Sequence, residues 1–256
     1  MFRVENESTL SASEERKSVY SGNSSLVVLR STPDCAMIVD TPQGAASEYF
    51  GMLRSRLLNA RNKSDIRSVI ITSPQKQDGK TFNSINLGIS LGQLQQLRIL
   101  LIDGDLRRSG ITEILALQRE PGLADFLQDW SPFENCVKAT SLSHLYVVPS
   151  GNFSPESLPA ILEGSRWPKF LEKAKEEFDL ILVDSVPVSA PIADFELLFN
   201  ACDSALLVVQ VGKTERAALD ITSTRMQGKL LGLIVNNKKL PNQFDYHSPS
   251  GGTRKE

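Results

Sequence analysis

The stretch Ser68–Arg108, SVIITSPQKQDGKTFNSINLGISLGQLQQLRILLIDGDLRR, decides the fold. It begins with a short β-branched run that is typical of a buried strand, and a polar loop without apolar periodicity follows. Gly79 then opens a segment with apolar residues close to helical spacing, and a second apolar run ends in Asp103-Gly104-Asp105. The pattern predicts a βαβ unit, in which two parallel strands flank a helix and the ligand site lies beyond the carboxyl ends of the strands.

The loop before the helix has the properties of a phosphate-binding site. Where a loop enters a helix, unpaired backbone N–H groups and the helix dipole favour an anion. Lys80 would place its ammonium on the β- and γ-phosphates of a nucleotide, and the Thr81 hydroxyl would bind Mg²⁺. A Gly-Lys-Thr triplet is common by chance, but this one lies between a strand and a helix and precedes an apolar run that ends in two acids. The nucleotide-binding residues that we predict in this loop are Gln77, Asp78, Gly79, Lys80, Thr81 and Phe82.

Two residues of this loop depart from the usual pattern G-x-x-x-x-G-K-[ST]. Pro74 stands at the position of the first glycine, and proline has no N–H and a fixed φ, so the loop must begin differently. Gln77 stands where many such loops carry a further glycine, and a side chain there restricts positive φ. We expect phosphate to bind through residues 78–82, which supply the main N–H donors, with an altered affinity.

Three carboxylates follow predicted strands at the edge where this loop lies. Asp103 and Asp105 leave their strand at the depth where a metal ion and a γ-phosphate would bind. The run 178–184 is an apolar strand that ends in Asp184, and P-loop enzymes place an Mg²⁺-ordering acid at this position. An aspartate that only caps the next turn is the alternative. We predict Thr81, Asp105 and Asp184 as the Mg²⁺ site.

Apolar runs typical of buried strands begin near residues 68, 99, 145, 179, 205 and 231, with helical patterns between them. This alternation predicts an α/β fold: a doubly wound, mostly parallel sheet with helices on both faces, as in P-loop NTPases. Right-handed crossovers would bring the loop and the three aspartates to one edge. Asn236 follows the last strand, where its amide is suited to bind an adenine edge or, equally, to cap the strand.

The polarity of the chain predicts three regions. Residues 1–45 are rich in Ser, Glu and Asn, which favours a mostly flexible extension with docking segments at the apolar runs 26–29 and 35–39. Residues 46–240 form the α/β domain, which opens with a helix over 47–59 that has Ser47 as its N-cap. Residues 241–256 are polar and are predicted to be disordered.

Composition and charge exclude several classes of protein. With 28 basic and 30 acidic residues the net charge is −2, so no nucleic-acid partner is expected from bulk electrostatics. No apolar run reaches the roughly 18 residues of a membrane-spanning helix, and the N-terminus lacks the apolar segment of a secretory signal. The three cysteines are widely spaced without a CxxC pair, as in a cytoplasmic protein with reduced thiols.

Several blocks, in one order, are similar to a known family. LLIDGDLRR resembles the second Walker-type motif of the cytoplasmic kinase domains of bacterial tyrosine kinases that govern capsule and exopolysaccharide synthesis. EPGLADFL, LYVVPSGNFSPESLPAIL and DLILVDSVPVSAPIAD resemble further blocks of the same domain. The resemblance covers roughly residues 45–237. It places the chain among P-loop ATPases, beside the septum-positioning and plasmid-partition proteins.

The resemblance implies an ATP-dependent protein-tyrosine kinase that uses Mg²⁺ and often phosphorylates its own C-terminal tail. Lys80 and Thr81 match the family's phosphate and Mg²⁺ residues. Asp103 matches the acid that takes the tyrosine proton, and a base is needed because the pKa of a free tyrosine hydroxyl is about 10. The catalytic residues implied are Lys80, Asp103, Asp105 and Asp184. This tail carries one tyrosine, Tyr246, so sparse autophosphorylation is expected.

The resemblance also implies partners. We expect the cytoplasmic segment of a separate, membrane-embedded polysaccharide chain-length regulator to bind this chain and hold it at the inner membrane. Self-association into rings uses the family pattern Glu-x-x-Arg-x-x-Arg. Here Gly51 replaces the first arginine and leaves Glu48 and Arg54, which argues against that form of ring.

Two other functions remain open at the level of sequence. Pro74, Gln77 and the poor tail favour a degenerate ATP-binding scaffold that regulates without catalysis. A partition-type ATPase, which acts through ATP-driven dimerisation, is the other alternative. Such proteins usually carry an additional lysine early in the loop, at a position that Lys76 does not occupy.

Overall fold

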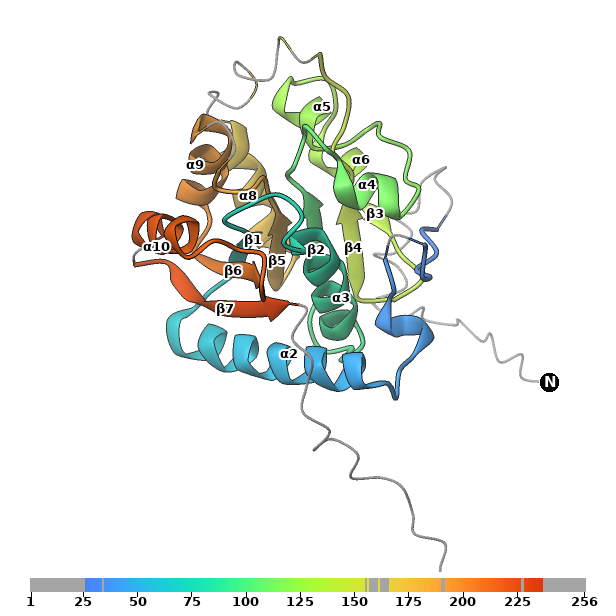
Figure 1. Cartoon of the computed structure of the whole chain (residues 1–256). Coiled ribbons are helices and arrows are strands. Elements are labelled where there is room, and N and C mark those ends of the chain that lie inside the picture. Colours follow the sequence, from blue (N-terminus) through green and yellow to red (C-terminus); the bar gives the residue numbers. More distant parts are fainter. Residues whose placement is uncertain are drawn as a thin grey trace, which may run out of the picture.

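The computed structural model describes residues 26–33, 35–154, 156, 161, 166–189, 192–226 and 228–236 (Figure 1). Within these residues a sheet of seven strands has the order β3-β4-β2-β5-β1-β6-β7. All neighbouring pairs are parallel except β3 and β4. The strands are β1 (Ser68–Thr72), β2 (Ile99–Asp103), β3 (Lys138–Ala139), β4 (Leu145–Val148), β5 (Leu180–Asp184), β6 (Ser204–Gln210) and β7 (Leu230–Asn236). The predicted doubly wound, mostly parallel sheet is confirmed.

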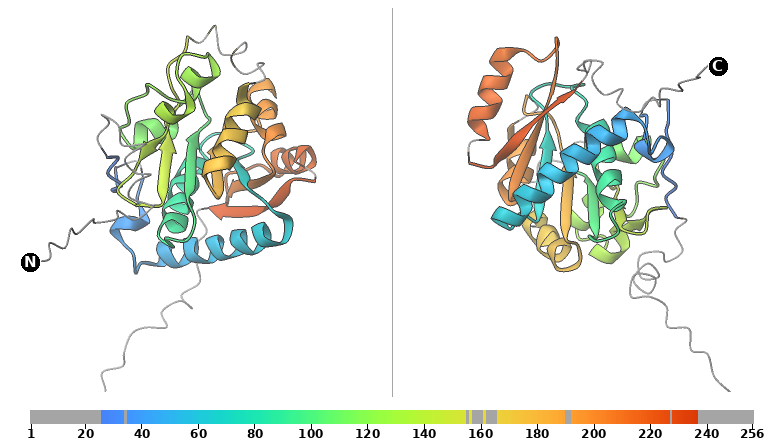
Figure 2. Two further views of the ribbon diagram at one scale, coloured as in Figure 1. Left: turned by 180° about the vertical axis from the view of Figure 1, so that it is seen from behind. Right: turned by 90° about the horizontal axis from the view of Figure 1, so that it is seen from below.

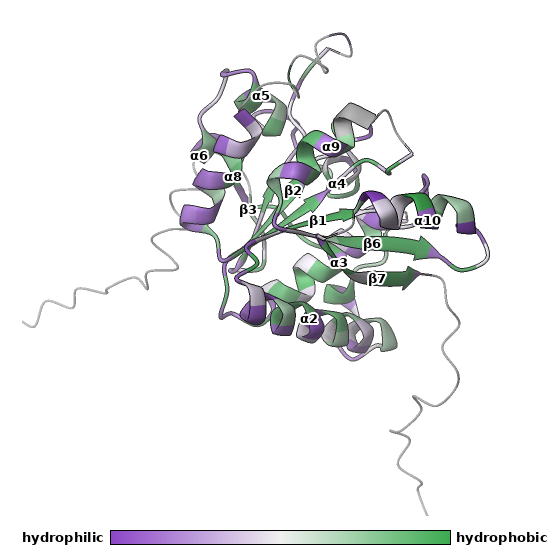
Figure 3. Ribbon diagram, turned by 90° about the vertical axis from the view of Figure 1, so that its left-hand side faces the viewer, coloured by the Kyte–Doolittle hydropathy of each residue, from purple (hydrophilic) through white to green (hydrophobic). Residues whose placement is uncertain are grey.

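Helices cover both faces of the sheet, so every residue of β1, β2, β4 and β5 is buried. Strand side chains alternate between two cores: Val69 and Ile71 face one, and Ile70 faces the other. Figure 3 shows these apolar strands lying between the helical layers. The helices are η1 (Ile38–Asp40), α2 (Ala45–Ser64), α3 (Lys80–Gly92), α4 (Gly110–Ile114), α5 (Leu123–Leu127), α6 (Phe133–Cys136), α8 (Arg166–Glu177), α9 (Ile192–Ala201) and α10 (Arg216–Arg225).

Helix α2 crosses the strands on the face that also carries α3 (Figure 2, right). It is longer than predicted at both ends, and its N-cap is Gly44 rather than Ser47. Ser47 lies in the first turn instead, where its hydroxyl donates to the Thr41 carbonyl at 2.6 Å. The apolar stripe ends before the polar second half of this helix. The apolar periodicity therefore did not predict the second half of the helix, where good helix formers such as Arg61 continue it.

The segment before α2 packs against the domain from residue 26 onward. Val27 pairs with Thr140 beside the edge strand β3, and Leu29, Met37 and Ile38 are buried. Part of the extension expected at 1–45 thus belongs to the core. Residues 1–25 and the tail at 241–256, with Tyr246, lie outside the described residues. In the part of the chain that the structure describes, no helix is both long and apolar enough to cross a membrane.

Candidate functional site

The predicted phosphate-binding loop starts at the end of β1, and it is held by the segment that follows β5 and by one of its own side chains. The N–H groups of Val188 and Ser189 donate to the carbonyls of Ser73 and Pro74 at 2.8 and 3.3 Å. Because these bonds use carbonyl oxygens, the N–H that Pro74 lacks is not needed here. The Gln75 N–H donates to the Asp78 carboxylate at 3.1 Å and closes the turn.

Gln77 adopts the left-handed conformation in which many such loops have a glycine. Its φ is +66°, so the side chain has not prevented the positive φ. A non-glycine residue in this region costs about 1–2 kcal/mol. The Lys213 ammonium lies 3.3 Å from the Gln77 carbonyl oxygen and 3.4 Å from Oε1, which offsets part of this cost. The turn is therefore retained under strain.

Replacing Gln77 with glycine should relieve this strain. We expect Gln77→Gly to raise the free energy of unfolding by about 0.5–1 kcal/mol, since the relief exceeds the entropy gained by the unfolded chain. Urea denaturation of the nucleotide-free protein measures the change. Gln75→Gly is the matched control, because Gln75 has no positive φ and its replacement should destabilise. A loss of stability in both variants would show that the positive φ of Gln77 does not destabilise the folded protein.

Gly79 closes the loop, and the last strand constrains it. Its φ is +96°, and a Cβ there would lie 2.0 Å from Nδ2 of Asn236. That amide nitrogen donates to the Asp78 carbonyl at 3.0 Å. Asn236 therefore braces the loop through its backbone, and only glycine fits beneath it.

Lys80 and Asp105 form a buried ion pair. Nζ of Lys80 lies 3.0 Å from Oδ2 of Asp105, and the two side chains are 10% and 2% exposed. Burial alone would lower the pKa of Lys80, but the charges of Asp184 and Asp105 outweigh it and raise the pKa above its usual value. The lysine therefore stays protonated, as phosphate binding requires.

Asp184 is the acceptor for two hydroxyls of α3. Thr81 Oγ1 donates to Oδ2 at 2.7 Å and Ser84 Oγ donates to Oδ1 at 2.9 Å. Burial raises the pKa of Asp184, against the opposing charge of Lys80 and the hydrogen bond from Thr81. Ser84 was not predicted. The signal for it was its position three residues after Thr81, on the same face of the helix.

Asp103 lies beside Asp184, its register partner on the neighbouring strand. Its Oδ2 accepts hydrogen bonds from Thr112 N at 2.8 Å and from Thr112 Oγ1 at 2.6 Å, whereas the buried Oδ1 has no hydrogen-bond partner. Burial raises the pKa of Asp103 to about 7, although the Thr112 hydroxyl opposes this. The carboxyl is therefore poised near neutral pH, but it is fully buried and does not line the adjacent pocket.

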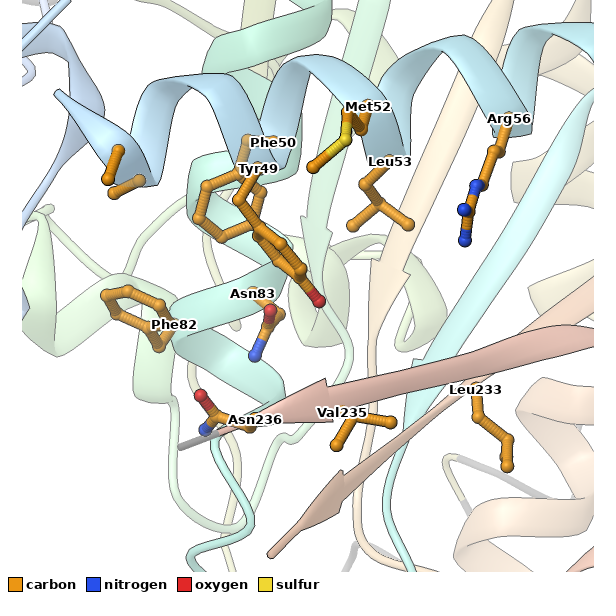
Figure 4. A pocket seen from close by; sticks show the side chains of 12 residues that line it. Tyr49, Phe50, Met52, Leu53, Arg56, Phe82, Asn83, Leu233, Val235 and Asn236 are labelled. Carbon is orange, nitrogen blue, oxygen red and sulfur yellow. The ribbon is translucent and has the colours of Figure 1, made fainter. Parts of the chain in front are cut away.

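Two pockets flank the beginning of α3. The first, of about 500 Å³, is lined by Gln77, Gly79, Lys80, Thr81, Phe82, Asp105, Arg108, Gly110, Glu113 and Ile114. Arg108 and Glu113 had not been predicted to face the site. The second, of about 510 Å³, lies between α2 and β7 (Figure 4). There Tyr49, Leu53 and Arg56 point toward Leu233 and Val235, and Phe82 and Asn236 line the end nearest the loop.

The donor set fits a magnesium ion that is shared with a nucleotide. In the described residues no three His, Cys, Asp or Glu side chains gather closely enough to hold a metal ion by themselves. Mg²⁺ in nucleotide sites is usually held by one or two protein oxygens together with phosphate and water. Thr81, Asp105 and Asp184 offer such oxygens at this edge of the sheet, and in the ligand-free chain Asp105 pairs with Lys80 while Asp184 accepts hydrogen bonds from Thr81 and Ser84.

Most of the predicted residues thus lie together at the carboxyl ends of β1, β2 and β5, which are the central strands of the sheet drawn in Figure 1. Lys80 meets Asp105, and Thr81 meets Asp184. Asp103 is adjacent but covered. Asn236 contacts the backbone of Asp78 at the other side of the loop.

Known proteins share this sequence and this fold. A family model described as an AAA domain matches residues 67–222. The tyrosine-protein kinase YwqD of Bacillus subtilis is 34% identical over 209 residues, which span 80% of this chain and 86% of YwqD. The solved tyrosine kinase domain of BceF is 27% identical, with a TM-score of 0.69 over 79% of this chain and 83% of that domain.

A more distant structure is similar in fold alone. The septum site-determining protein MinD from Pyrococcus horikoshii, solved with Mg-ADP, is 22% identical, with a TM-score of 0.54 over 66% of this chain and 68% of MinD. YwqD and the BceF domain are both more similar to this chain than MinD is. This protein belongs to the bacterial tyrosine-protein kinases, a family of ATP-dependent enzymes with a P-loop fold.

Proposed function

We propose that this chain transfers the γ-phosphoryl group of ATP to tyrosine with Lys80, Thr81, Asp103, Asp105 and Asp184 as its working residues. The observation that carries the proposal is the convergence of two pairs, Lys80 with Asp105 and Thr81 with Asp184, at the mouth of the phosphate-binding loop. Thr81 and Asp184 would hold Mg²⁺, which neutralises charge on the phosphates when it is bound. The Lys80 ammonium pairs with Asp105 in the ligand-free chain and would pair with the phosphates when the nucleotide binds.

Asp103 is proposed as the base. Its free Oδ1 takes the proton of the tyrosine hydroxyl while the phenolic oxygen bonds to the γ-phosphorus and the bond to the β-phosphate oxygen breaks, which releases ADP. A carboxyl with a pKa near 7 is matched to this task at cellular pH. Because Asp103 is fully buried in the ligand-free chain, substrate binding must open a path to Oδ1.

A label-transfer assay tests the proposal. Purified protein is incubated with Mg²⁺ and γ-labelled ATP, and phosphotyrosine is located by mass spectrometry on the chain and on an added poly(Glu,Tyr) copolymer. We expect label on tyrosine that disappears when Mg²⁺ is chelated. ATP binding without phosphotyrosine under all these conditions would favour the scaffold alternative.

The role that we propose is control of capsule or exopolysaccharide synthesis together with a membrane-embedded chain-length regulator. The family resemblance supports it, and through this partner the kinase would work at the inner membrane. A ring built on the α2 pattern is not part of the proposal. Arg54 donates to the Ser90 carbonyl of its own chain at 2.6 Å, and Gly51 offers no guanidinium. The label assay repeated with the regulator's cytoplasmic segment tests the partnership, and an unchanged rate would contradict it.

The adenine is proposed to lie between Phe82, which lines both pockets, and Asn236, which lines the pocket between α2 and β7. Replacing Asn236 with aspartate keeps the size of the side chain but removes the amide that donates to the loop. We expect ATP to bind about tenfold more weakly, since one hydrogen bond is lost and a charge is added near the phosphates. Fluorescent ATP and GTP analogues measure this. Adenine recognition predicts a larger loss for ATP than for GTP, whereas equal losses would show that Asn236 only braces the loop.

A further inference from the structure

Thr112, in the first turn of α4, contacts Asp103 twice and is 2% exposed. Its N–H and its hydroxyl both donate to Oδ2 of Asp103, at 2.8 and 2.6 Å. Neither contact involves Oδ1, which is buried and has no hydrogen-bond partner. The two oxygens of this carboxylate therefore have different environments, and one residue creates the difference.

This asymmetry decides which oxygen is free to react. The last torsion of an aspartate side chain is broad and nearly two-fold, so an unrestrained carboxylate exchanges its two oxygens readily. Hydrogen bonds to a charged carboxylate are roughly twice as strong as neutral ones. Two of them on Oδ2 hold the plane of the carboxylate and leave the lone pairs of Oδ1 in one place.

Thr112 is itself held by the strand next to β2. The Ser150 N–H donates to Thr112 Oγ1 at 2.9 Å, just beyond the end of β4. A hydroxyl has one proton and two lone pairs, and Ser150 occupies a lone pair. The hydroxyl proton is therefore directed to Asp103, and the hydroxyl cannot turn away without breaking both bonds. All three residues are buried, so water does not compete for these bonds.

We propose that Thr112 is a positioning residue for phosphoryl transfer, which fixes the Asp103 carboxylate so that Oδ1 is the oxygen that receives the tyrosine proton. The inference rests on the proposed role of Asp103 as the base. It assigns to Thr112 no contact with the nucleotide. Loss of its hydroxyl should therefore affect turnover and leave ATP binding unchanged.

The test compares Thr112→Val, which keeps the shape, with Thr112→Ser, which keeps the hydroxyl. With Mg-ATP and poly(Glu,Tyr), we expect the valine variant to lose about ten- to a hundredfold in kcat, the effect of one hydrogen bond to a charged group. KM for ATP should stay within about twofold, and the serine variant should recover most of the rate. In the nucleotide-free protein, the Ser150 amide should exchange with solvent faster in the valine variant because its acceptor is lost.

Thr140→Val is the matched control. Thr140 is 1% exposed, and its hydroxyl donates to the Leu145 carbonyl at 2.8 Å, at the opposite end of β4. Both valine variants remove a buried hydroxyl that donates a hydrogen bond, so both should lose stability, but kcat should be unchanged in Thr140→Val. Equal losses of kcat in both valine variants, or a loss that serine does not restore, would reduce Thr112 to a structural role and overturn the inference.

The remaining outcomes are also decisive. Wild-type kcat in Thr112→Val, or an unchanged exchange rate at Ser150, would overturn the inference and leave the proposed function intact. Absence of phosphotyrosine from the wild-type protein would overturn both, and it is recognised because it precedes any variant. If Thr112→Val does not fold, Thr112→Cys takes its place. Its weaker thiol donor should give an intermediate kcat, and an unchanged kcat would again contradict the proposal.

Discussion

Lys80→Met is expected to lower the rate of tyrosine phosphorylation by about a hundred- to a thousandfold or more. The ammonium is the mobile cation of the site, and preorganised charge at the transferred phosphate is usually the largest single contribution to such catalysis. Stability should fall as well, by about 3–5 kcal/mol, because Asp105 is left buried without its partner. The rate is read from labelled poly(Glu,Tyr), and stability from urea denaturation.

Lys175→Met is the control that separates the loss of rate from the general effect of breaking an ion pair. Lys175 forms an ion pair of 2.7 Å with Asp203, far along the chain from the loop, with side chains 28% and 31% exposed. Its loss should cost at most about 1 kcal/mol and leave the rate unchanged. If Lys80→Met retained more than about a tenth of the wild-type rate, the role given to Lys80 would be wrong.

Asp103→Asn is expected to abolish phosphorylation and yet stabilise the nucleotide-free protein above pH 7. In the folded chain Asp103 keeps its proton up to a pKa of about 7, whereas in the unfolded chain it loses it near 3.8. The folded state thus binds more protons between these values, so stability falls as pH rises through this window. Asparagine carries no charge, and its carbonyl still accepts both bonds from Thr112. A gain of up to about 4 kcal/mol at pH 8, vanishing near pH 4, follows.

Urea denaturation of both proteins from pH 4 to 8 measures this dependence. Asp203→Asn is a control of opposite sign. Burial alone would raise the pKa of Asp203, but hydrogen bonds from Lys175 and from the Arg67 and Ser68 N–H groups lower it. Its replacement should therefore destabilise at neutral pH. Equal stability of Asp103→Asn and wild type at pH 8 would show that burial of the Asp103 charge does not destabilise the folded protein, and would contradict the raised pKa.

Local patterns in the sequence were sufficient to predict the sheet and the position of the site. β1, β2 and β5 are apolar runs that end in a polar residue, and parallel strands bring such ends together. The antiparallel strand β3 was missed because two residues are too short to show a period. The full length of α2 was missed because its second half carries no apolar stripe.

Residues that act through long-range contacts could not be predicted in the same way. Thr112 lies nine residues beyond Asp103 in a short helix, and its contact with Ser150 joins segments 38 residues apart. No periodicity encodes such a contact. The burial of Asp103 likewise depends on how α4 folds back over β2. The positive φ of Gln77 could not be predicted either, because a side chain at this position is expected to disfavour positive φ.

Asn236 is both the last described residue of β7 and the side chain that braces the phosphate-binding loop. The last described residue of the chain therefore lies against the loop of the proposed nucleotide site. Tension on the chain beyond Asn236 would pull on the residue that braces the loop. Affinity tags and fluorescent fusions are for this reason better attached at the amino end when nucleotide binding is to be measured.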